Sequence, residues 1–425
     1  MRLASVKIFA SIRRVFRFSL WDERIFVKRV IGIIVCVCVL VGARMVAAQH
    51  VTVTKSGGAK IGVSLQGVTA SGGAAQAVRR TLENNLNRSG WMQVVSGPAG
   101  ILVAGDIKES GGQVAFTCKV TDAGGQTVLH ATYSQPMARA IYVAHQVAND
   151  IVVKVTGKPT FFLGRLAVIG TRSGAKELYL MDSSAQDIQQ VTQDRAIALK
   201  PRWSPDNRFI SYTSYLKRWP DVYTIELANG ARNRVAAYPG VNSGGAISPD
   251  GRSMALILSK DGNPDLYVKD MASGRLTRLT QTPRATEGSP AWSPDGSRIV
   301  YVADTSGTPQ LYMLSRSGGS PERLTLSGSQ NVAPDWGANG LIAYQALAGG
   351  KFQIAVIDPA TKQSRILTPF DGAAYEDPSW APDGRHLAAT RAVNYRYSVI
   401  LLDSMDNKYV ALTTSGDWYA PAWSH

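Results

Sequence analysis

From residue 161 to the end of the chain, short apolar runs and polar turns alternate in a constant order. Residues 298–303 (RIVYVA), 310–315 (QLYMLS) and 322–325 (ERLT) are runs that are continuously apolar or that alternate between apolar and polar positions. Runs of this length, bounded by Gly, Pro, Asp and Asn, are typical of antiparallel strands. The pattern therefore predicts that this region is built of β-sheet.

A Pro-x-Trp strand followed by a Ser-Pro-Asp-Gly turn, or close variants of both, marks the period of this pattern. The positions before the successive turns are Trp203, Ile247, Trp292, Trp336, Trp380 and Trp423, which lie 43 to 45 residues apart. Ser, Pro, Asp and Gly suit the positions of a type I turn between two strands. A repeat of this length with four strands is typical of one blade of a β-propeller, so the sequence predicts six blades.

The two ends of the repeat region predict that the blades close into a ring. Residues 161–192 contain three strands without a preceding Pro-x-Trp strand, whereas residues 421–425 (PAWSH) contain that strand with no others after it. An open array would leave two unpaired sheet edges. We therefore predict a mainly β fold, with a six-bladed β-propeller over residues 161–425 that is closed by its C-terminal strand.

Residues 49–157 show a mixed pattern that predicts a small N-terminal α/β domain. Two segments have helical periodicity, 74–88 and 138–155, and each is followed by a glycine that suits a helix end. Between and around them lie strand-like segments at 51–54, 61–65, 92–95, 101–106, 113–121 and 127–134.

The first 48 residues have the order of a secretory signal peptide. A basic stretch precedes the 13-residue apolar run 30–42, and small residues precede Gln49. An uncleaved membrane anchor is the alternative, although roughly 20 apolar residues are needed to span a bilayer. We expect cleavage, which would lower the net charge from +15 to +8 and leave Cys118 as the only cysteine. The remaining charge is moderate and dispersed, so no nucleic-acid partner is expected.

The motifs of common catalytic sites are missing from the sequence. There is no G-x-S-x-G nucleophile elbow and no phosphate loop, and the five histidines share no metal-ligand spacing. The acidic residues of the turns, Asp206, Asp250, Asp295 and Asp383, are explained by turn chemistry, because Asp hydrogen-bonds its own backbone there. We therefore expect no catalytic residue, no cofactor and no metal, and a protein that is not an enzyme.

The order of these parts resembles the TolB family of the Tol–Pal system. The resemblance covers nearly the whole chain after the signal peptide and is supported by 61–63 (IGV), 265–280 (DLYVKDMASGRLTRLT), 328–331 (GSQN) and 421–424 (PAWS). Two features depart from the family pattern. Only 96–100 (SGPAG) separates two strands where relatives often have a further helix, and Val241 precedes Asn242 where relatives often have His.

The resemblance implies a periplasmic protein of outer-membrane integrity and cell division that acts by binding two partners. The propeller would hold a Pal-like peptidoglycan-associated lipoprotein. A TolA-like inner-membrane protein would contact the segment Gln49, His50, Val51, Thr52, Val53 and Thr54. The protein itself is expected to be a monomer. The alternative is a secreted propeller enzyme or carbohydrate-binding module that uses the central channel.

The sequence also predicts which face of the propeller holds the Pal-like partner. The segments that lead into the Pro-x-Trp strands differ from blade to blade, whereas the turns stay nearly uniform, and a varied face with aromatic and charged residues suits recognition. Read as loops at one channel mouth, these segments give the candidate residues Leu199, Lys200, Asn242, Ser243, Gly244, Thr286, Glu287, Gly288, Ser289, Gln330, Asn331, Val332, Tyr375, Glu376, Asp377, Trp418 and Tyr419. Unconstrained variation in solvated loops is the alternative.

Overall fold

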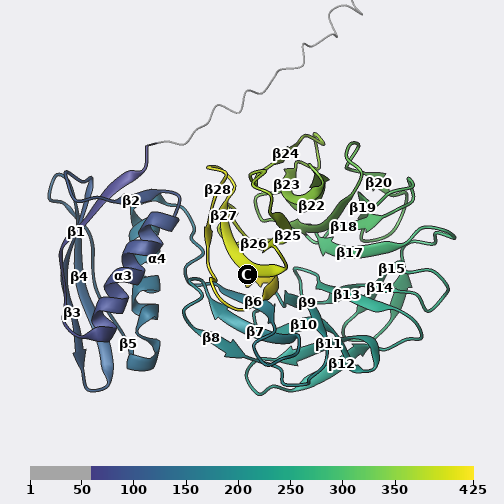
Figure 1. Cartoon of the computed structure of the whole chain (residues 1–425), viewed down its shortest axis with the longest axis horizontal. Helices are drawn as coiled ribbons and strands as arrows, with labels where there is room; N and C mark the ends of the chain where they lie inside the picture. Colours follow the sequence, from purple (N-terminus) through teal and green to yellow (C-terminus); the bar gives the residue numbers. More distant parts are fainter. Residues whose placement is uncertain (1–58) are drawn as a thin grey trace, which may run out of the picture. The chain divides into compact units, whose positions relative to one another are not determined.

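In the computed structural model, which describes residues 59–425, a five-stranded sheet with two helices is followed along the chain by six four-stranded sheets (Figure 1). The expected signal peptide, the expected strand 51–54 and the candidate segment 49–54 lie outside the described residues. Among residues 59–425, no helix has the length and apolar character to cross a membrane.

The N-terminal part is the predicted small α/β fold. Its elements are β1 (Ile61–Ala70), α3 (Gly73–Arg88), β2 (Met92–Val94), β3 (Ile101–Ser110), β4 (Gln113–Asp122), β5 (Thr127–Pro136), the short 3₁₀ helix η1 (Met137–Arg139) and α4 (Ile141–Thr156). The sheet order is β2-β1-β3-β4-β5, with β1 parallel to both neighbours. The second helix begins later than the sequence pattern indicates because η1 takes up its first turn. It ends at Gly157, which has a left-handed φ of +67°.

The helices are held to the sheet by their apolar stripes. Val78 and Leu82 of α3 and Val147 and Ile151 of α4 are buried in the same cluster as Phe116 of β4. The thiol of Cys118 is also buried, and burial raises its pKa to about 11. This agrees with a packing role rather than a reactive one.

The remaining strands form the six blades that the repeat predicts. Blade one is β9 (Ala198–Trp203), β10 (Phe209–Lys217), β11 (Trp219–Glu226) and β12 (Arg232–Ala236), and blade two is β13 (Asn242–Ile247), β14 (Ser253–Leu258), β15 (Asp265–Asp270) and β16 (Leu276–Arg278). Blade three is β17 (Glu287–Trp292), β18 (Arg298–Ala303), β19 (Gln310–Ser315) and β20 (Glu322–Arg323), and blade four is β21 (Asn331–Trp336), β22 (Ile342–Ala348), β23 (Lys351–Ile357) and β24 (Ser364–Ile366). Blade five is β25 (Ala374–Trp380), β26 (His386–Val393), β27 (Arg396–Asp403) and β28 (Lys408–Ala411).

Blade six confirms that the C-terminal strand closes the ring. Its sheet order is β29-β6-β7-β8, formed by β29 (Trp418–Trp423), β6 (Arg165–Gly170), β7 (Glu177–Asp182) and β8 (Ile188–Gln190). Trp418 of β29 pairs with Gly170, and Trp423 pairs with Leu166. The first and last segments of the propeller therefore share one sheet, and no blade is left incomplete.

The Ser-Pro-Asp-Gly turn is copied because each of its residues has a structural use. In blade three, the Ser293 hydroxyl donates to the Asp295 carboxylate and accepts the Arg298 backbone N–H at 2.9 Å. The same carboxylate accepts the Ser297 N–H at 3.0 Å, and Gly296 takes a left-handed φ of +68°. These contacts confirm the turn interpretation of Asp295.

Strand direction gives the propeller two different faces. The turns between the first and second strands of each blade lie on one face, together with the connections between the third and fourth strands; we call it the turn face. The hairpins between the second and third strands lie on the other, together with the segments that lead into the next blade; we call it the loop face.

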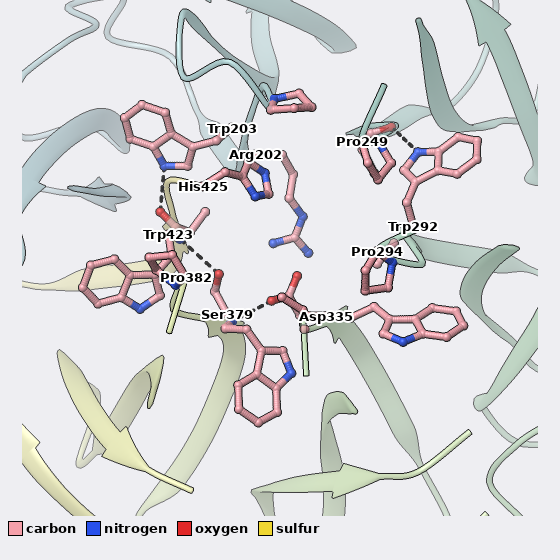
Figure 2. A pocket seen from close by; sticks show the side chains of 18 of the residues that line it. Arg202, Trp203, Pro249, Trp292, Pro294, Asp335, Ser379, Pro382, Trp423 and His425 are labelled. Carbon is pink, nitrogen blue, oxygen red and sulfur yellow. Dashed lines mark hydrogen bonds between the residues drawn. The ribbon is translucent and has the colours of Figure 1, made fainter. Parts of the chain in front are cut away.

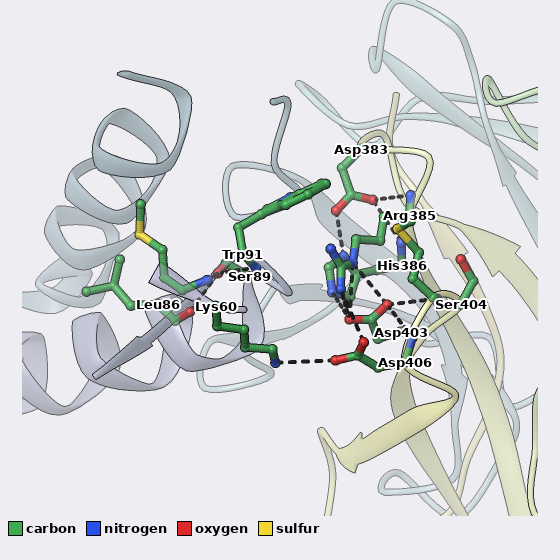
Figure 3. Close-up of polar contacts among 12 residues, drawn as sticks. Lys60, Leu86, Ser89, Trp91, Asp383, Arg385, His386, Asp403, Ser404 and Asp406 are labelled. Carbon is green, nitrogen blue, oxygen red and sulfur yellow. Dashed lines mark hydrogen bonds and ion pairs between the residues drawn. The ribbon is translucent and has the colours of Figure 1, made fainter. Parts of the chain in front are cut away.

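The small α/β domain contacts the turn face (Figure 3), within one compact unit that holds all described residues. His145 of α4 is 3.0 Å from Asp182, at the end of β7, and both side chains are buried. Lys60 lies 3.5 Å from Asp406, and the Arg385 guanidinium stacks over Trp91 at 4.5 Å. Asp182, Arg385 and Asp406 all belong to turn-face connections of blades five and six, so the domain leaves the loop face of the propeller uncovered.

Candidate functional site

The innermost strand of each blade carries a β-bulge at nearly the same level of the central channel. The pairing with the second strand shifts register there in all six blades. The bulge residues have positive φ between +45° and +50° in five blades, namely Lys200, Ser289, Ala333, Asp377 and Ala420, and the sixth is Gly244 at +93°. Non-glycine residues rarely adopt this conformation, so backbone strain is repeated around the axis.

The channel is narrow at this level. The space bounded by Lys200, Ala333, Asp377, Ala420 and neighbouring prolines is only about 10 Å³. The Lys200 ammonium donates to the Ser289 hydroxyl at 3.2 Å, which links blade one to blade three. The bulges therefore make a constriction rather than an open passage through the ring.

On the turn face, the channel widens into a cavity of about 320 Å³ (Figure 2). Its wall includes tryptophans from the repeats, and two of their indoles hydrogen-bond a neighbouring blade. Trp203 Nε1 donates to the Ala422 carbonyl at 2.9 Å, and Trp292 Nε1 donates to the Ala246 carbonyl at 2.9 Å. Because these rings are almost fully buried, they do not offer the exposed aromatic faces on which a sugar could stack.

The prediction that the candidate residues for the Pal-like partner lie in loops is wrong for most of them. They form the first halves of the innermost strands, and only Thr286 and Gln330 lie just before a strand. The reason is the β-bulge, which lets each strand begin before the proline that was taken as its start. The candidates do share one rim, because all six strands begin on the loop face.

Burial divides these candidates into three groups. Lys200, Thr286 and Gln330 are exposed, and half-buried positions are Leu199, Ser243, Gly244, Gly288, Ser289, Val332, Glu376, Asp377 and Tyr419. Asn242, Glu287, Asn331, Tyr375 and Trp418 are buried. Only the first two groups can offer side-chain surface to a partner without rearrangement.

The buried candidates hold the segments of the loop face in place. The amide of Asn242 donates to the Tyr238 carbonyl at 2.7 Å, and that of Asn331 donates to the Ser327 carbonyl at 2.9 Å. The Tyr375 hydroxyl donates to the Asp371 carboxylate at 3.0 Å. These contacts act within the protein, each between a strand and the segment before it.

Glu287 is the buried candidate with the most perturbed acidity. Burial raises its pKa to about 7, and one carboxylate oxygen accepts the Thr282 hydroxyl at 2.8 Å. The other oxygen is buried with no hydrogen-bond partner within residues 59–425. The pKa of Glu287 therefore lies near neutral pH while the group is packed within the strand.

Sequence reasoning missed the side chains that are most exposed on the loop face. Large apolar residues are exposed in its hairpins and connecting segments, namely Ile197, Tyr215, Leu216, Trp219, Val241, Leu326, Phe370 and Tyr395. Trp219 is 68% exposed and Tyr395 is 90% exposed. An aromatic residue between two strand patterns was the available signal, but a linear pattern does not say that hairpins of different blades share a face.

A family model described as the TolB beta propeller domain matches residues 152–425. The Tol-Pal system protein TolB of Gluconobacter oxydans is 33% identical over 341 residues, which are 75% of each chain. A protein TolB homolog of Chlorobaculum tepidum is 28% identical over 244 residues, and the match spans 52% of this chain but only 56% of the relative.

A solved structure supports the same relationship. The crystal structure of TolB from Acinetobacter baumannii is similar with a TM-score of 0.74 and 25% sequence identity, and the match covers 86% of this chain and 96% of that one. The similarity thus extends beyond the propeller into the described part of the N-terminal region.

Proposed function

The chain belongs to the TolB family, and we propose that it is a periplasmic binding protein of the Tol–Pal system whose propeller holds a Pal-like peptidoglycan-associated lipoprotein. In this proposal the protein links that lipoprotein to inner-membrane Tol proteins and supports outer-membrane integrity and cell division. It works as a monomer and by binding rather than catalysis.

The observation that carries the proposal is the contrast between the two faces of the propeller. The loop face carries eight large exposed apolar side chains, whereas the turn face is contacted by the α/β domain. Clusters of exposed apolar residues in soluble proteins mark interaction surfaces, and aromatic residues are enriched at their centres. We therefore assign the lipoprotein to the loop face, which is also the face that the sequence favoured.

We propose the segment 49–54 as the contact for a TolA-like partner. The support for this assignment is the family relationship together with the polar, glycine-ended sequence QHVTVTKSGG at 49–58. A short polar segment of this kind binds by ordering on its partner rather than by docking as a folded surface.

The alternative of an enzyme or carbohydrate-binding module that uses the channel has less support. The channel is constricted at the bulges, and Trp203, Trp292, Trp380 and Trp423 of the turn-side cavity are buried.

Calorimetric titration with the soluble domain of the Pal-like lipoprotein from the same envelope tests the proposed face. Trp219→Ala on the loop face is expected to weaken binding, and Met405→Ala on the turn face serves as the matched control, because both side chains are exposed. Loss of binding in the Met405 variant with normal binding in the Trp219 variant would indicate that the lipoprotein binds the turn face.

A further inference from the structure

The loop face is not uniform around the ring. The hairpin of blade one is built from strands of 9 and 8 residues and that of blade five from two strands of 8, whereas the corresponding strands of blades two, three and six have 6 residues each. Each of these hairpins has 18 residues in all, so the longer strands leave tight turns of one residue in blade one and two residues in blade five, whereas blades two, three and six have six-residue loops. Blades one and five are the two neighbours of blade six.

The tips of these two tight hairpins combine exposed aromatic side chains with backbone strain. Arg218, next to the exposed Trp219, has φ of +77°, and Asn394 and Tyr395 have φ of +48° and +60°. Glycine is the usual residue where a hairpin needs positive φ, and other residues there cost about 1 kcal/mol or more each. Strain of this kind that is kept at an exposed aromatic residue points to a use of the side chain outside the fold.

Contacts across blade six connect the two hairpins into one continuous surface. The rings of Tyr397 in blade five and Tyr419 in blade six are 4.4 Å apart, and the Lys176 ammonium lies 4.8 Å from the centre of the Tyr419 ring. The Lys176 carbonyl accepts the Ala198 N–H at 2.9 Å. The neighbouring Ile197 carbonyl accepts the Tyr215 N–H at 2.9 Å, and this contact reaches the hairpin of blade one.

We call this surface the aromatic-basic arc. Its apolar members are Ile197, Tyr215, Leu216, Trp219 and Tyr395, and its cations are Arg172, Lys176, Lys217, Arg218 and Arg396.

The cations of the arc are poorly neutralised. Arg172 lies over the Trp418 ring at 4.6 Å, and the ion pairs within residues 59–425 include neither Lys217 nor Arg218. Arg396 lies 3.7 Å from Asp417, at the long end of the ion-pair range. The arc therefore carries excess positive charge.

The opposite half of the loop face differs in its charge. Lys260 of blade two pairs with Asp261 at 2.7 Å. Its exposed apolar residues, such as Leu326 and Phe370, lie in segments between blades rather than at tight hairpin tips. The two halves thus offer a partner different chemistry.

We propose that the aromatic-basic arc, across blades five, six and one, is the part of the loop face that holds the protein partner, and that this partner presents acidic residues around an apolar centre. The inference rests on the proposed function for the identity of the partner as a Pal-like lipoprotein. Exposed aromatic side chains supply the desolvated anchors of an interface, and complementary charge around them speeds association.

Binding of the soluble lipoprotein domain to matched variants tests the arc. Trp219→Ala in the arc is compared with Phe370→Ala in the opposite half, since both remove a large exposed aromatic ring. We expect about tenfold weaker binding for the arc variant and less than about twofold for the control. The double variant Lys217→Glu with Arg218→Glu is expected to slow association and to reduce its dependence on salt.

Tyr395→Gly separates binding from folding. The change gives the turn the Asn-Gly sequence that its backbone favours, so the melting temperature is expected to stay or rise while affinity falls about tenfold. Unchanged affinity in this variant and in Trp219→Ala would overturn the arc.

The remaining outcomes distinguish this inference from the proposed function. If the Phe370 and Leu326 variants lose binding and the arc variants keep it, the arc is wrong but docking on the loop face stands. If the parent protein does not bind the lipoprotein, the arc inference and the proposed function are both overturned. If the arc variants lose binding only to phosphatidylglycerol vesicles and keep the lipoprotein, the arc serves a membrane surface and the inference of a protein partner is overturned.

Discussion

Single residues on the loop face have two separate uses that burial distinguishes. Asn242, Asn331 and Tyr375 are buried and hydrogen-bond the segments before their strands, whereas Trp219 and Tyr395 are exposed and make no such link. A sequence shows that both kinds differ from blade to blade, but the burial that separates them depends on packing between blades. Sequence reasoning therefore identified residues that share one rim, and several of them support that rim from within.

Tyr375→Ala is expected to destabilise the protein rather than to act only on binding. The change removes a fully buried ring and its hydrogen bond to Asp371, for which a loss of about 3–5 kcal/mol in the free energy of unfolding is usual. Chemical denaturation of the variant measures this loss. A parent-like unfolding midpoint combined with lost affinity would instead indicate that Tyr375 contacts the partner.

Glu287→Gln is expected to change how stability depends on pH. Because burial raises the pKa of Glu287 from 4.5 to about 7, its contribution to folding is fully present below about pH 4.5 and is lost as the pH rises through 7. At pH 8 the variant should be more stable than the parent by about 1–2 kcal/mol, and the two should converge at low pH. Denaturation curves between pH 4.5 and 8 check this, and a variant that is less stable at pH 8 would contradict it.

At the scale of elements, the turns could be predicted from sequence and the bulges could not. The Ser-Pro-Asp-Gly turn depends on contacts among neighbouring residues, such as those of Ser293 and Asp295, so its chemistry is visible in the linear order. The bulges at Lys200 and Asp377 arise from pairing with a neighbouring strand and from crowding at the axis. The tight aromatic hairpins of blades one and five were missed for a similar reason, because a linear pattern does not show that hairpins of different blades lie on one face.

Asp295→Ala is expected to reduce stability and leave binding unchanged. The carboxylate accepts the Ser293 hydroxyl and the Ser297 N–H, and its pKa is lowered to about 2 by these hydrogen bonds. Loss of these turn contacts should cost about 1–2 kcal/mol. Thermal denaturation and titration with the lipoprotein measure the two effects, and the reverse pattern would place the partner on the turn face.

At the scale of the whole molecule, the order of the α/β part and the propeller was predictable because each has a recognisable pattern of apolar and polar residues. The repeat of four strands predicted the six blades. The partial repeats at the two ends of the propeller region predicted the closure between β29 and β6. The contact between the α/β domain and blades five and six was not predictable, since it depends on single pairs such as His145 and Asp182 from distant parts of the chain.

Deletion of residues 421–425 is expected to lower the melting temperature sharply and to increase aggregation. Trp423 would bury on the order of 200 Å², and the deletion also leaves the edge of β6 unpaired. Removal of His425 alone is the graded comparison: it lies outside β29 and costs only the two backbone hydrogen bonds to Asn207, so it should lower the melting temperature much less. A five-residue deletion that melts like the parent would contradict the closed ring.

Removal of residues 49–58 is expected to abolish binding of a TolA-like protein and to leave the melting temperature nearly unchanged. The segment has no apolar periodicity after Thr54, so it contributes little to a core. Titration of the shortened protein with the TolA-like domain measures the first effect, and binding equal to that of the full mature chain would remove this segment as the contact.

The central claim, that the loop face holds the lipoprotein, is tested most directly by hydrogen–deuterium exchange with and without that partner. The account predicts slower exchange in the complex at the hairpins 214–219 and 393–396, with unchanged exchange at the turns 204–208 and 293–297. Protection confined to the turns, with no change at the hairpins, would contradict it.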